Sequence, residues 1–196
     1  MPYPAGHKER IRARIVDAAR RLFNRNGFEQ VSIDQIMAAA DLTRGGFYHY
    51  FESKDALYAA AVTSFRACSP FAVRVAQVEP DQREPRALAR MLVKLYLSDE
   101  VLDDPDQHCP LYALPSDVAR AGLSPQKAYT ELIRGIANVH LAALQGEPDA
   151  AQRAQAIVSL CVGGMVLART THDPELRQSL RAAALRQALE LLGEPA

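Results

Sequence analysis

Residues 44–50 concentrate hydrogen-bonding side chains on one short segment. Arg44 brings a guanidinium, and residues 48–50 bring three aromatic rings that carry polar atoms. If the segment is helical, Phe47 and Phe51 share one face and the polar groups lie on the remaining surface. A guanidinium and three polar rings on one exposed turn are the groups that bind phosphates and base edges.

Two short helices joined by a tight turn would position these groups. Ser32 and Gln35 form a Ser-x-x-Gln capping box, which marks the start of a first helix. Residues 41–43 are too few for anything but a turn, and Thr43 can cap a second helix that begins at Arg44.

The second helix contains Gly45 and Gly46, which are poor helix formers at a cost of about 1 kcal/mol each relative to alanine. Adjacent glycines make sense where another backbone must approach closely. We therefore interpret residues 32–51 as a helix-turn-helix whose second helix lies in a DNA groove. An ordinary helical hairpin within an all-α bundle is the alternative that periodicity alone leaves open.

The spacing in this region resembles the DNA-binding signature of the tetracycline-repressor (TetR) family of bacterial transcriptional regulators. The match covers roughly the first sixty residues and rests on Gly27-Phe28, Ser32, Ile36, Ala39-Ala40, Leu42-Thr43-Arg44-Gly45, Phe47-Tyr48, Tyr50-Phe51, Ser53-Lys54 and Leu57.

The resemblance also implies roles for individual residues. Phosphate contacts would come from Ser32, Thr43, Tyr48 and Lys54, and base edges or adjoining backbone would face Arg44, Gly45, Gly46, His49 and Tyr50. The chain departs from the family pattern at three positions. Asp41 replaces the usual turn glycine but tolerates the left-handed conformation. Gly46 replaces a common Ser, Thr or Ala, and Asp34 replaces a frequent basic residue, where it suits a helix N-terminus but opposes a phosphate.

Charge is distributed unevenly along a chain whose net charge is zero. Residues 1–25 carry seven basic and two acidic side chains, whereas residues 56–196 carry 14 basic and 16 acidic ones. On the first helix, a basic stripe lies beside the apolar one and comprises Arg10, Arg14, Arg21 and Arg25. A stripe of this kind is often a solvated face, but beside a helix-turn-helix we favour contact with phosphates.

Patterning along the whole chain predicts an all-α fold of about nine helices, with no strand pattern and no internal repeat. We expect a three-helix DNA-binding head with the helix-turn-helix at residues 1–55. Residues 56–196 would form a C-terminal helical bundle that binds a ligand and dimerises.

Composition indicates the class of protein. No run of eighteen apolar residues predicts a membrane span, and residues 1–8 lack the apolar region of a secretory signal. Three separated cysteines without a CxxC pair exclude a cysteine-rich zinc site or a disulfide scaffold, and they fit a reducing cytoplasm. We expect no metal and no cofactor.

The last two helices are the expected site of self-association, because the terminal helix is apolar on two sides. The candidate interface comprises Gly164, Ala168, Leu176, Leu180, Ala184 and Leu191. In the family, these helices form a four-helix dimer interface. A homodimer would place two recognition helices on a palindromic double-stranded operator. The alternative is that both apolar sides of the terminal helix pack into the core of a single chain.

A small-molecule inducer would favour a packing of the C-terminal bundle in which the spacing of the two recognition helices no longer matches that of the DNA grooves. Candidate pocket residues are Phe65, Phe71, Met91, Tyr96, His108, Cys109, Tyr112 and His140, for which core packing is the competing interpretation. Tyr96, Tyr112 and His140 stand out because each brings a polar group to an apolar interior. Cys109 could be a thiolate sensor of electrophiles or oxidants, helped by a neighbouring imidazolium, or an inert buried thiol.

Other classes of protein have less support. Five scattered histidines and the absence of GxSxG, HExxH or a phosphate loop argue against an enzyme. A purely structural helical bundle would explain the body but not the polar segment from Arg44 to Tyr50.

Overall fold

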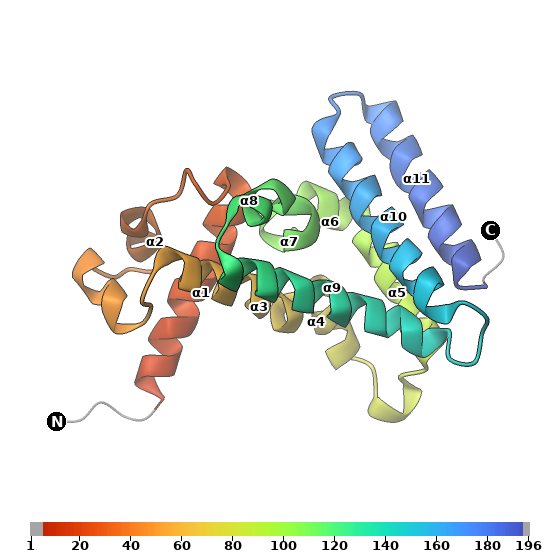
Figure 1. The fold of residues 1–196 in the computed structure, drawn as a ribbon, viewed down its shortest axis with the longest axis horizontal. Helices are drawn as coiled ribbons and strands as arrows, with labels where there is room; N and C mark the ends of the chain where they lie inside the picture. Colours follow the sequence, from red (N-terminus) through yellow and green to blue (C-terminus); the bar gives the residue numbers. More distant parts are fainter. Residues whose placement is uncertain (1–5, 194–196) are drawn as a thin grey trace. The chain divides into compact units, whose positions relative to one another are not determined.

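The computed structural model describes residues 6–193, and all regular secondary structure in that range is helical (Figure 1). The described chain divides into two compact units. The first comprises residues 6–65 and 114–131, and the second comprises residues 66–113 and 132–193. Helices α3 (Lys54–Cys68) and α9 (Leu123–Ala143) contribute residues to both units.

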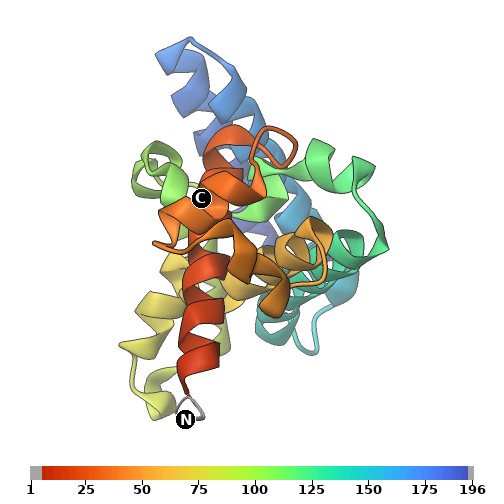
Figure 2. The ribbon, with the colours of Figure 1, turned by 90° about the vertical axis from the view of Figure 1, so that its left-hand side faces the viewer.

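The first unit contains the expected helix-turn-helix. Its elements are α1 (His7–Asn26), α2 (Ile33–Ala39), the 3-10 helix η1 (Arg44–His49), most of α3, α8 (Pro115–Arg120) and the start of α9. Figure 2 shows α1 as the long helix of this unit, with α2 and η1 following it. The predicted capping box is present: Ser32 Oγ accepts from the Gln35 amide at 3.2 Å, and Gln35 Oε1 accepts from the Ser32 amide at 2.8 Å.

Aromatic packing holds α1 against α3 in the first unit. The Phe28 ring stacks on Tyr58 at 4.4 Å, and Phe23 meets Tyr58 edge-on at 5.1 Å. All three side chains are buried. Ring pairs of this kind contribute about 0.5–1.5 kcal/mol beyond their buried area.

The backbone of Phe28 is held on both sides. Its amide donates to Asp117 Oδ2 at 3.1 Å, and its carbonyl accepts from Lys54 Nζ at 2.5 Å. Asp117 lies on α8, so a segment remote in sequence completes the end of α1. Gly27 makes this approach possible, because its φ is +79° and a side-chain Cβ there would lie 3.1 Å from Asp117 Oδ2.

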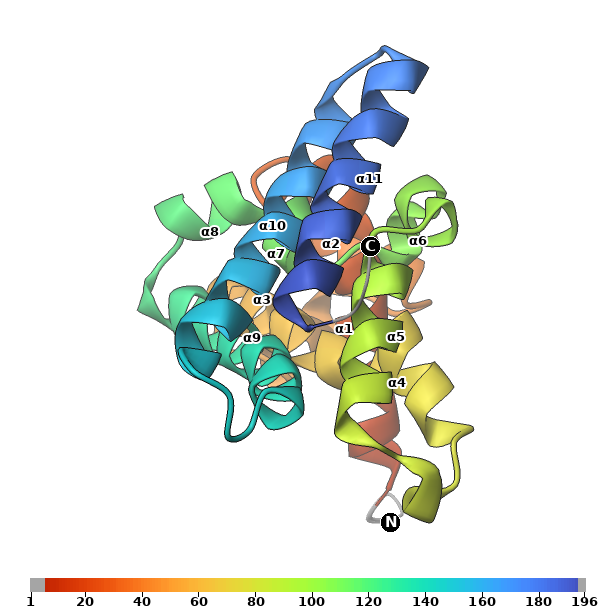
Figure 3. The same cartoon turned by 90° about the vertical axis from the view of Figure 1, so that its right-hand side faces the viewer.

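The second unit is a helical bundle. It contains the end of α3, α4 (Pro70–Ala76), η2 (Pro80–Gln82), α5 (Pro85–Tyr96), α6 (Asp99–Asp103), η3 (Pro105–Gln107), α7 (Pro110–Ala113), most of α9, α10 (Ala150–Thr170) and α11 (Pro174–Leu191). Helices α10 and α11 run side by side in opposite directions, as Figure 3 shows.

The contact between α10 and α11 is close because glycine faces alanine. A Cβ added at Gly164 would lie 2.8 Å from Ala184 Cβ. Three residues before Ala184 on α11, the buried Arg181 donates from Nη1 to the Leu97 carbonyl at 2.9 Å and pairs through Nη2 with Asp99. Arg181 thus ties α11 to the end of α5 and the start of α6.

Three sequence expectations differ from the structure. The described residues hold eleven α-helices and three 3-10 helices rather than about nine, mainly because prolines divide residues 99–120 into short turns. The helix that begins at Arg44 is 3-10 rather than α, and its two glycines weaken the α-helical form. Thr43 occupies the cap position of this helix, but its side chain makes no capping hydrogen bond.

Among the described residues, α10 is the one helix long and apolar enough to cross a membrane, judged by length and composition only. It packs against α11, α7 and α5, and its Arg153 and Arg169 donate to the carbonyls of Leu191 and Tyr112. The expectation that residues 1–8 are not a signal falls largely on residues 1–5, outside the described range.

Candidate nucleic-acid interface

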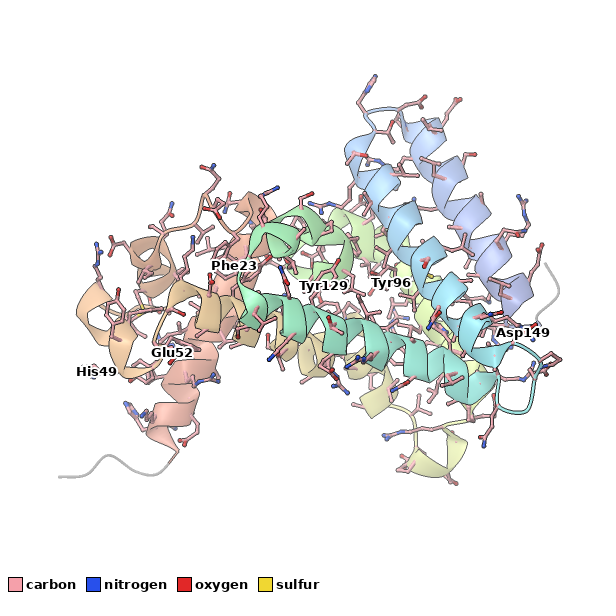
Figure 4. The ribbon with its side chains drawn as sticks, viewed as in Figure 1. Phe23, His49, Glu52, Tyr96, Tyr129 and Asp149 are labelled. Atoms are coloured by element: carbon pink, nitrogen blue, oxygen red, sulfur yellow. The ribbon has the colours of Figure 1, made fainter. Side chains whose placement is uncertain are left out.

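The 3-10 helix η1 has one buried face and one exposed polar face. Phe47 is fully buried and Phe51 nearly so, with ring centroids 6.0 Å apart, as their spacing predicted. Arg44 and His49 are exposed, and Tyr48 is 67% exposed. Figure 4 places His49 at the outer edge of the η1 segment. A buried pair of phenylalanines therefore presents the polar side chains outward.

The two glycines of η1 differ in their surroundings. No atom lies within 4 Å of a Cβ built on the exposed Gly45, whereas one on Gly46 would lie 3.7 Å from Met37 Cε. Gly45 leaves open surface that another molecule's backbone can approach, and Gly46 is half-buried against α2. The two residues expected to share one role thus occupy different environments.

Tyr48 and Tyr50 flank this surface in different ways. The exposed Tyr48 ring packs edge-on against Phe47 at 5.2 Å, which orients its hydroxyl outward from a fixed support. Tyr50 ends the 3-10 turn and is half-buried.

Some of the residues expected to bind phosphate already make hydrogen bonds within the chain, and others do not. The Ser32 hydroxyl is exposed but takes part in the capping box, and Thr43 is exposed. Lys54 is half-buried, and its ammonium lies 4.1 Å from the Phe28 ring centroid while it donates to the Phe28 carbonyl. Burial lowers the pKa of Lys54, opposed by the carboxylates of Glu29 and Asp55. Its ammonium therefore stabilises the α1–α3 junction.

Two arginines near the turn form ion pairs that sequence reasoning missed. Arg44 Nη1 lies 2.8 Å from Asp34 Oδ2. Arg14 Nη2 donates to the Ala40 carbonyl at 2.5 Å and pairs with Asp41 at 3.2 Å. Asp41 adopts φ 52°, the left-handed conformation that its residue type was expected to tolerate. No local pattern predicts these pairs, since their members lie on different elements.

The comparisons with known proteins agree with this geometry. Residues 15–61 match the family model of bacterial regulatory proteins, tetR family. The resemblance to the tetR family is thus confirmed for these residues. The matched residues run from the middle of α1 to the first half of α3 and include the whole helix-turn-helix.

Two curated relatives and one solved structure extend the comparison. The chain is 46% identical over 46 residues to the transposon Tn10 TetC protein of Escherichia coli, which is 24% of this chain and 23% of that protein. It is 30% identical over 95 residues to the HTH-type transcriptional regulator TtgR of Pseudomonas putida, 48% of this chain and 45% of that protein. The chain thus matches less than half the length of either relative.

A tetR-family transcriptional regulator from Streptomyces coelicolor has a similar fold over most of the chain. Its TM-score is 0.68 at 26% identity, with 93% of this chain and 80% of that chain covered. Similarity in sequence is thus concentrated in the helix-turn-helix, while similarity in fold extends to the helical body.

Four of the candidate pocket residues lie together in the second unit, where the His108 ring centroid is 5.2 Å from that of Tyr112. The Tyr96 and Tyr112 rings meet edge-on at 5.6 Å, and the Cys109 thiol lies close enough to the Tyr96 hydroxyl to influence its pKa. All four are buried, as the view in Figure 4 shows for Tyr96 among the helices of that unit. Neither tyrosine hydroxyl has a hydrogen-bond partner that meets normal geometry.

The other pocket candidates are distributed differently. Phe65 is buried in the first unit, and Met91 and Phe71 are half-buried in the second. His140 is 1% exposed on α9, and burial lowers its pKa to about 4. Within the described part of the chain, no three His, Cys, Asp or Glu side chains are grouped as metal ligands would be.

The environment of Cys109 contradicts the chemistry expected of a thiolate sensor. Burial raises the pKa of the Cys109 thiol to about 12, so the thiol stays protonated at neutral pH. Burial also lowers the pKa of the neighbouring His108, which removes the imidazolium that was expected to activate Cys109. The exposed cysteine is Cys68, on α3.

The residues expected at a dimer interface fall into two groups. Gly164, Ala168 and Ala184 are buried in the contact between α10 and α11 of the same chain. Leu176 is 47% exposed, and Leu180 and Leu191 are half-buried beside the face of α11 that holds Ala184. Sequence reasoning missed Leu167, which is 52% exposed on α10.

Proposed function

We propose that the chain is a ligand-responsive transcriptional regulator of the tetR family that binds operator DNA through η1. One observation carries the proposal: the exposed polar face of η1, with Arg44, Tyr48 and His49, is fixed by the buried Phe47 and a capped α2. Preorganised donors on a short helix are suited to contact phosphates and base edges in the major groove.

The remaining candidates support this surface. Thr43 and Tyr48 supply exposed hydroxyls for phosphates, and the exposed Gly45 leaves room for close approach. The basic residues of α1 would add sequence-independent attraction. Repression of a palindromic operator in the cytoplasm is the role we assign to the protein.

We propose that the regulator is a homodimer that pairs through the outer sides of α10 and α11. The support is a stripe at helical spacing on α10, formed by Ala156, Leu160, Gly163 and Leu167, all of which are half-buried or exposed. Leu176 and Leu180 continue an apolar surface on α11. Two copies of such a surface, related by a twofold axis, would form a four-helix contact.

We also propose that a small molecule regulates the protein by binding near Tyr96 and Tyr112. A buried hydroxyl without a partner costs about 1–3 kcal/mol, so the Tyr112 hydroxyl favours a ligand that supplies a donor or an acceptor, while the Tyr96 hydroxyl meets only the Cys109 thiol. Burial raises the pKa of both hydroxyls above the ordinary tyrosine value, so they would meet the ligand in their neutral form.

The test of DNA binding is a gel shift with the DNA that flanks the protein's own coding region. A specific complex that weakens steeply as salt is raised is expected, because contacts with phosphates release counterions. A scrambled duplex of equal composition is the control. Equal retardation of both duplexes, or none, contradicts the proposal, and sedimentation of the same sample tests the dimer.

A further inference from the structure

The ion pair between Arg44 and Asp34 bridges the starts of the two helices in the helix-turn-helix. Arg44 Nη1 donates to Asp34 Oδ2 at 2.8 Å, and the side chains are 69% and 55% exposed. We propose that Asp34 is a specificity-determining positioning residue: it orients Arg44 toward a guanine edge and keeps it from binding phosphates at random. The inference rests on the proposed DNA-binding function.

Both members of the pair are attached to fixed backbone. Asp34 lies in the first turn of α2, directly after the capping box of Ser32 and Gln35. Arg44 is the first residue of η1, which the buried Phe47 holds in place. A carboxylate in the first turn of a helix is also favoured by the partial positive charge there. The guanidinium is therefore restrained at its tip as well as at its backbone.

The pairing leaves half of the guanidinium for DNA. Arginine has five N–H donors in a rigid plane, and one Nη1 donor points at Asp34. The edge formed by Nε and Nη2 remains, and two parallel donors match the O6 and N7 acceptors of guanine. The neighbouring Gly45 adds no side chain that could block a base edge from reaching this donor pair.

The same pairing changes what a phosphate gains from Arg44. A free exposed arginine attracts any phosphate, which strengthens binding to every sequence equally. With Asp34 at 2.8 Å the local charge is balanced, so a phosphate gains little while a guanine edge still gains both hydrogen bonds. Asp34 therefore increases discrimination between DNA sequences and lowers the affinity for DNA of any sequence.

The pair between Arg14 and Asp41 provides a matched comparison within the same unit. Its Nη2–Oδ2 distance is 3.2 Å, and the Asp41 side chain is 90% exposed. Arg14 Nη2 also donates to the Ala40 carbonyl at 2.5 Å, so its guanidinium is engaged with the turn itself. Asparagine tolerates the left-handed conformation of Asp41, so Asp41→Asn removes one carboxylate without straining the turn.

The experiment compares full-length wild type, Asp34→Asn, Asp34→Glu and Asp41→Asn. Each is measured on a duplex selected by the wild type from a randomised pool and on a scrambled duplex, over a salt series. For Asp34→Asn we expect the ratio of the two affinities to fall about tenfold. Its affinity for the scrambled duplex should rise, and its salt slope should steepen by about 0.9 as Arg44 turns to a phosphate.

The controls separate charge from positioning. Asp41→Asn should leave the affinity ratio unchanged, and Asp34→Glu should restore most of it. In an Arg44→Ala background, Asp34→Asn should no longer change the ratio, because the residue through which it acts is absent. Circular dichroism of each variant checks that the helices are intact.

Two results have distinct meanings. If the wild type selects no sequence from the pool, the proposed DNA-binding function itself fails. If the wild type is selective but Asp34→Asn and Asp41→Asn change both affinities by the same factor, Asp34 acts only as a charge and the inference is overturned. Persistence of the Asp34→Asn effect in the Arg44→Ala background also overturns it.

Discussion

Asp117 and Phe28 lie 89 positions apart in the sequence, yet the Asp117 carboxylate accepts a hydrogen bond from the Phe28 amide at 3.1 Å. The Asp117 side chain is only 16% exposed, so water does not replace this bond easily. Asp117→Ala should lower the free energy of unfolding by about 1–3 kcal/mol, because a partly buried amide loses its acceptor.

The control for this prediction is Arg120→Ala. Arg120 pairs with Asp117 at 2.9 Å but its side chain is 63% exposed, so its loss should change stability by less than about 1 kcal/mol. Urea denaturation of both variants measures the difference. Equal destabilisation by the two substitutions would show that the surface ion pair, and not the amide contact, is what matters.

Tyr48→Phe should weaken DNA binding by about fivefold, the effect of losing one hydrogen bond of roughly 1 kcal/mol to a phosphate. Tyr48 is 67% exposed, so the thermal melting of the variant should match that of the wild type. Binding to specific and scrambled duplexes should fall by the same factor, whereas Arg44→Ala should also reduce the preference between them. Fluorescence anisotropy at fixed salt separates these patterns, and a loss confined to the specific duplex would reassign Tyr48 to base contact.

Gly164→Ala should destabilise the protein by about 1–3 kcal/mol, because the added Cβ would lie 2.8 Å from Ala184 Cβ and would force α10 and α11 apart. Gly163→Ala is the matched control, since nothing lies within 4 Å of a Cβ there. Because Gly163 lies in the proposed dimer stripe, both variants are measured at protein concentrations where the chain is monomeric, and there Gly163→Ala should stabilise α10 by up to about 1 kcal/mol through helix propensity. Thermal unfolding followed by circular dichroism tests the pair, and a tolerated alanine at 164 would mean that the helices are less tightly packed.

The buried His140 should make stability depend on pH. Burial lowers the folded-state pKa of His140 to about 4, while the unfolded chain titrates near 6.5. Between these values the unfolded state binds more protons, so stability is full above pH 6.5 and falls as pH drops toward 4. The contribution is on the order of 3 kcal/mol. His140→Phe should flatten this part of the curve of unfolding free energy against pH, and an unchanged slope would contradict the assignment.

Thiol labelling should distinguish the three cysteines. Cys68 is exposed and should react with a disulfide reagent in the native protein, whereas the buried Cys109 and Cys161, each with a pKa raised to about 12, should react only after denaturation. Cys68→Ser should abolish rapid labelling. Fast labelling of Cys109 in the native Cys68→Ser variant would revive a thiol-sensing role.

Local rules predicted much of the first unit. The capping box at Ser32 and the shared burial of Phe47 and Phe51 follow from residue type and short spacing, and the left-handed Asp41 follows from the glycine at that turn position in the family pattern. The 3-10 form of η1 was not predicted, because the competition between two glycines and the buried phenylalanine is decided by tertiary contacts.

Contacts between distant segments could not be predicted from a single sequence. The pairing of Arg44 with Asp34 and of Phe28 with Asp117 depends on how elements pack, which periodicity does not encode. The same holds in the second unit. Tyr96, Tyr112 and Cys109 were each singled out as candidates, but only the fold brings their side chains together.

The unit that carries η1 is assembled from two separate stretches of chain, residues 6–65 and 114–131. A fragment that stops after residue 65 would leave the Phe28 amide without its acceptor and would remove Asp117 and Tyr129, the polar neighbours of Tyr58. Protein engineers who exchange this unit between regulators therefore need to transplant both stretches as a set. A chimera that takes only residues 6–65 from one parent would receive residues 114–131 from the other parent. The residue facing the Phe28 amide would then come from a different protein.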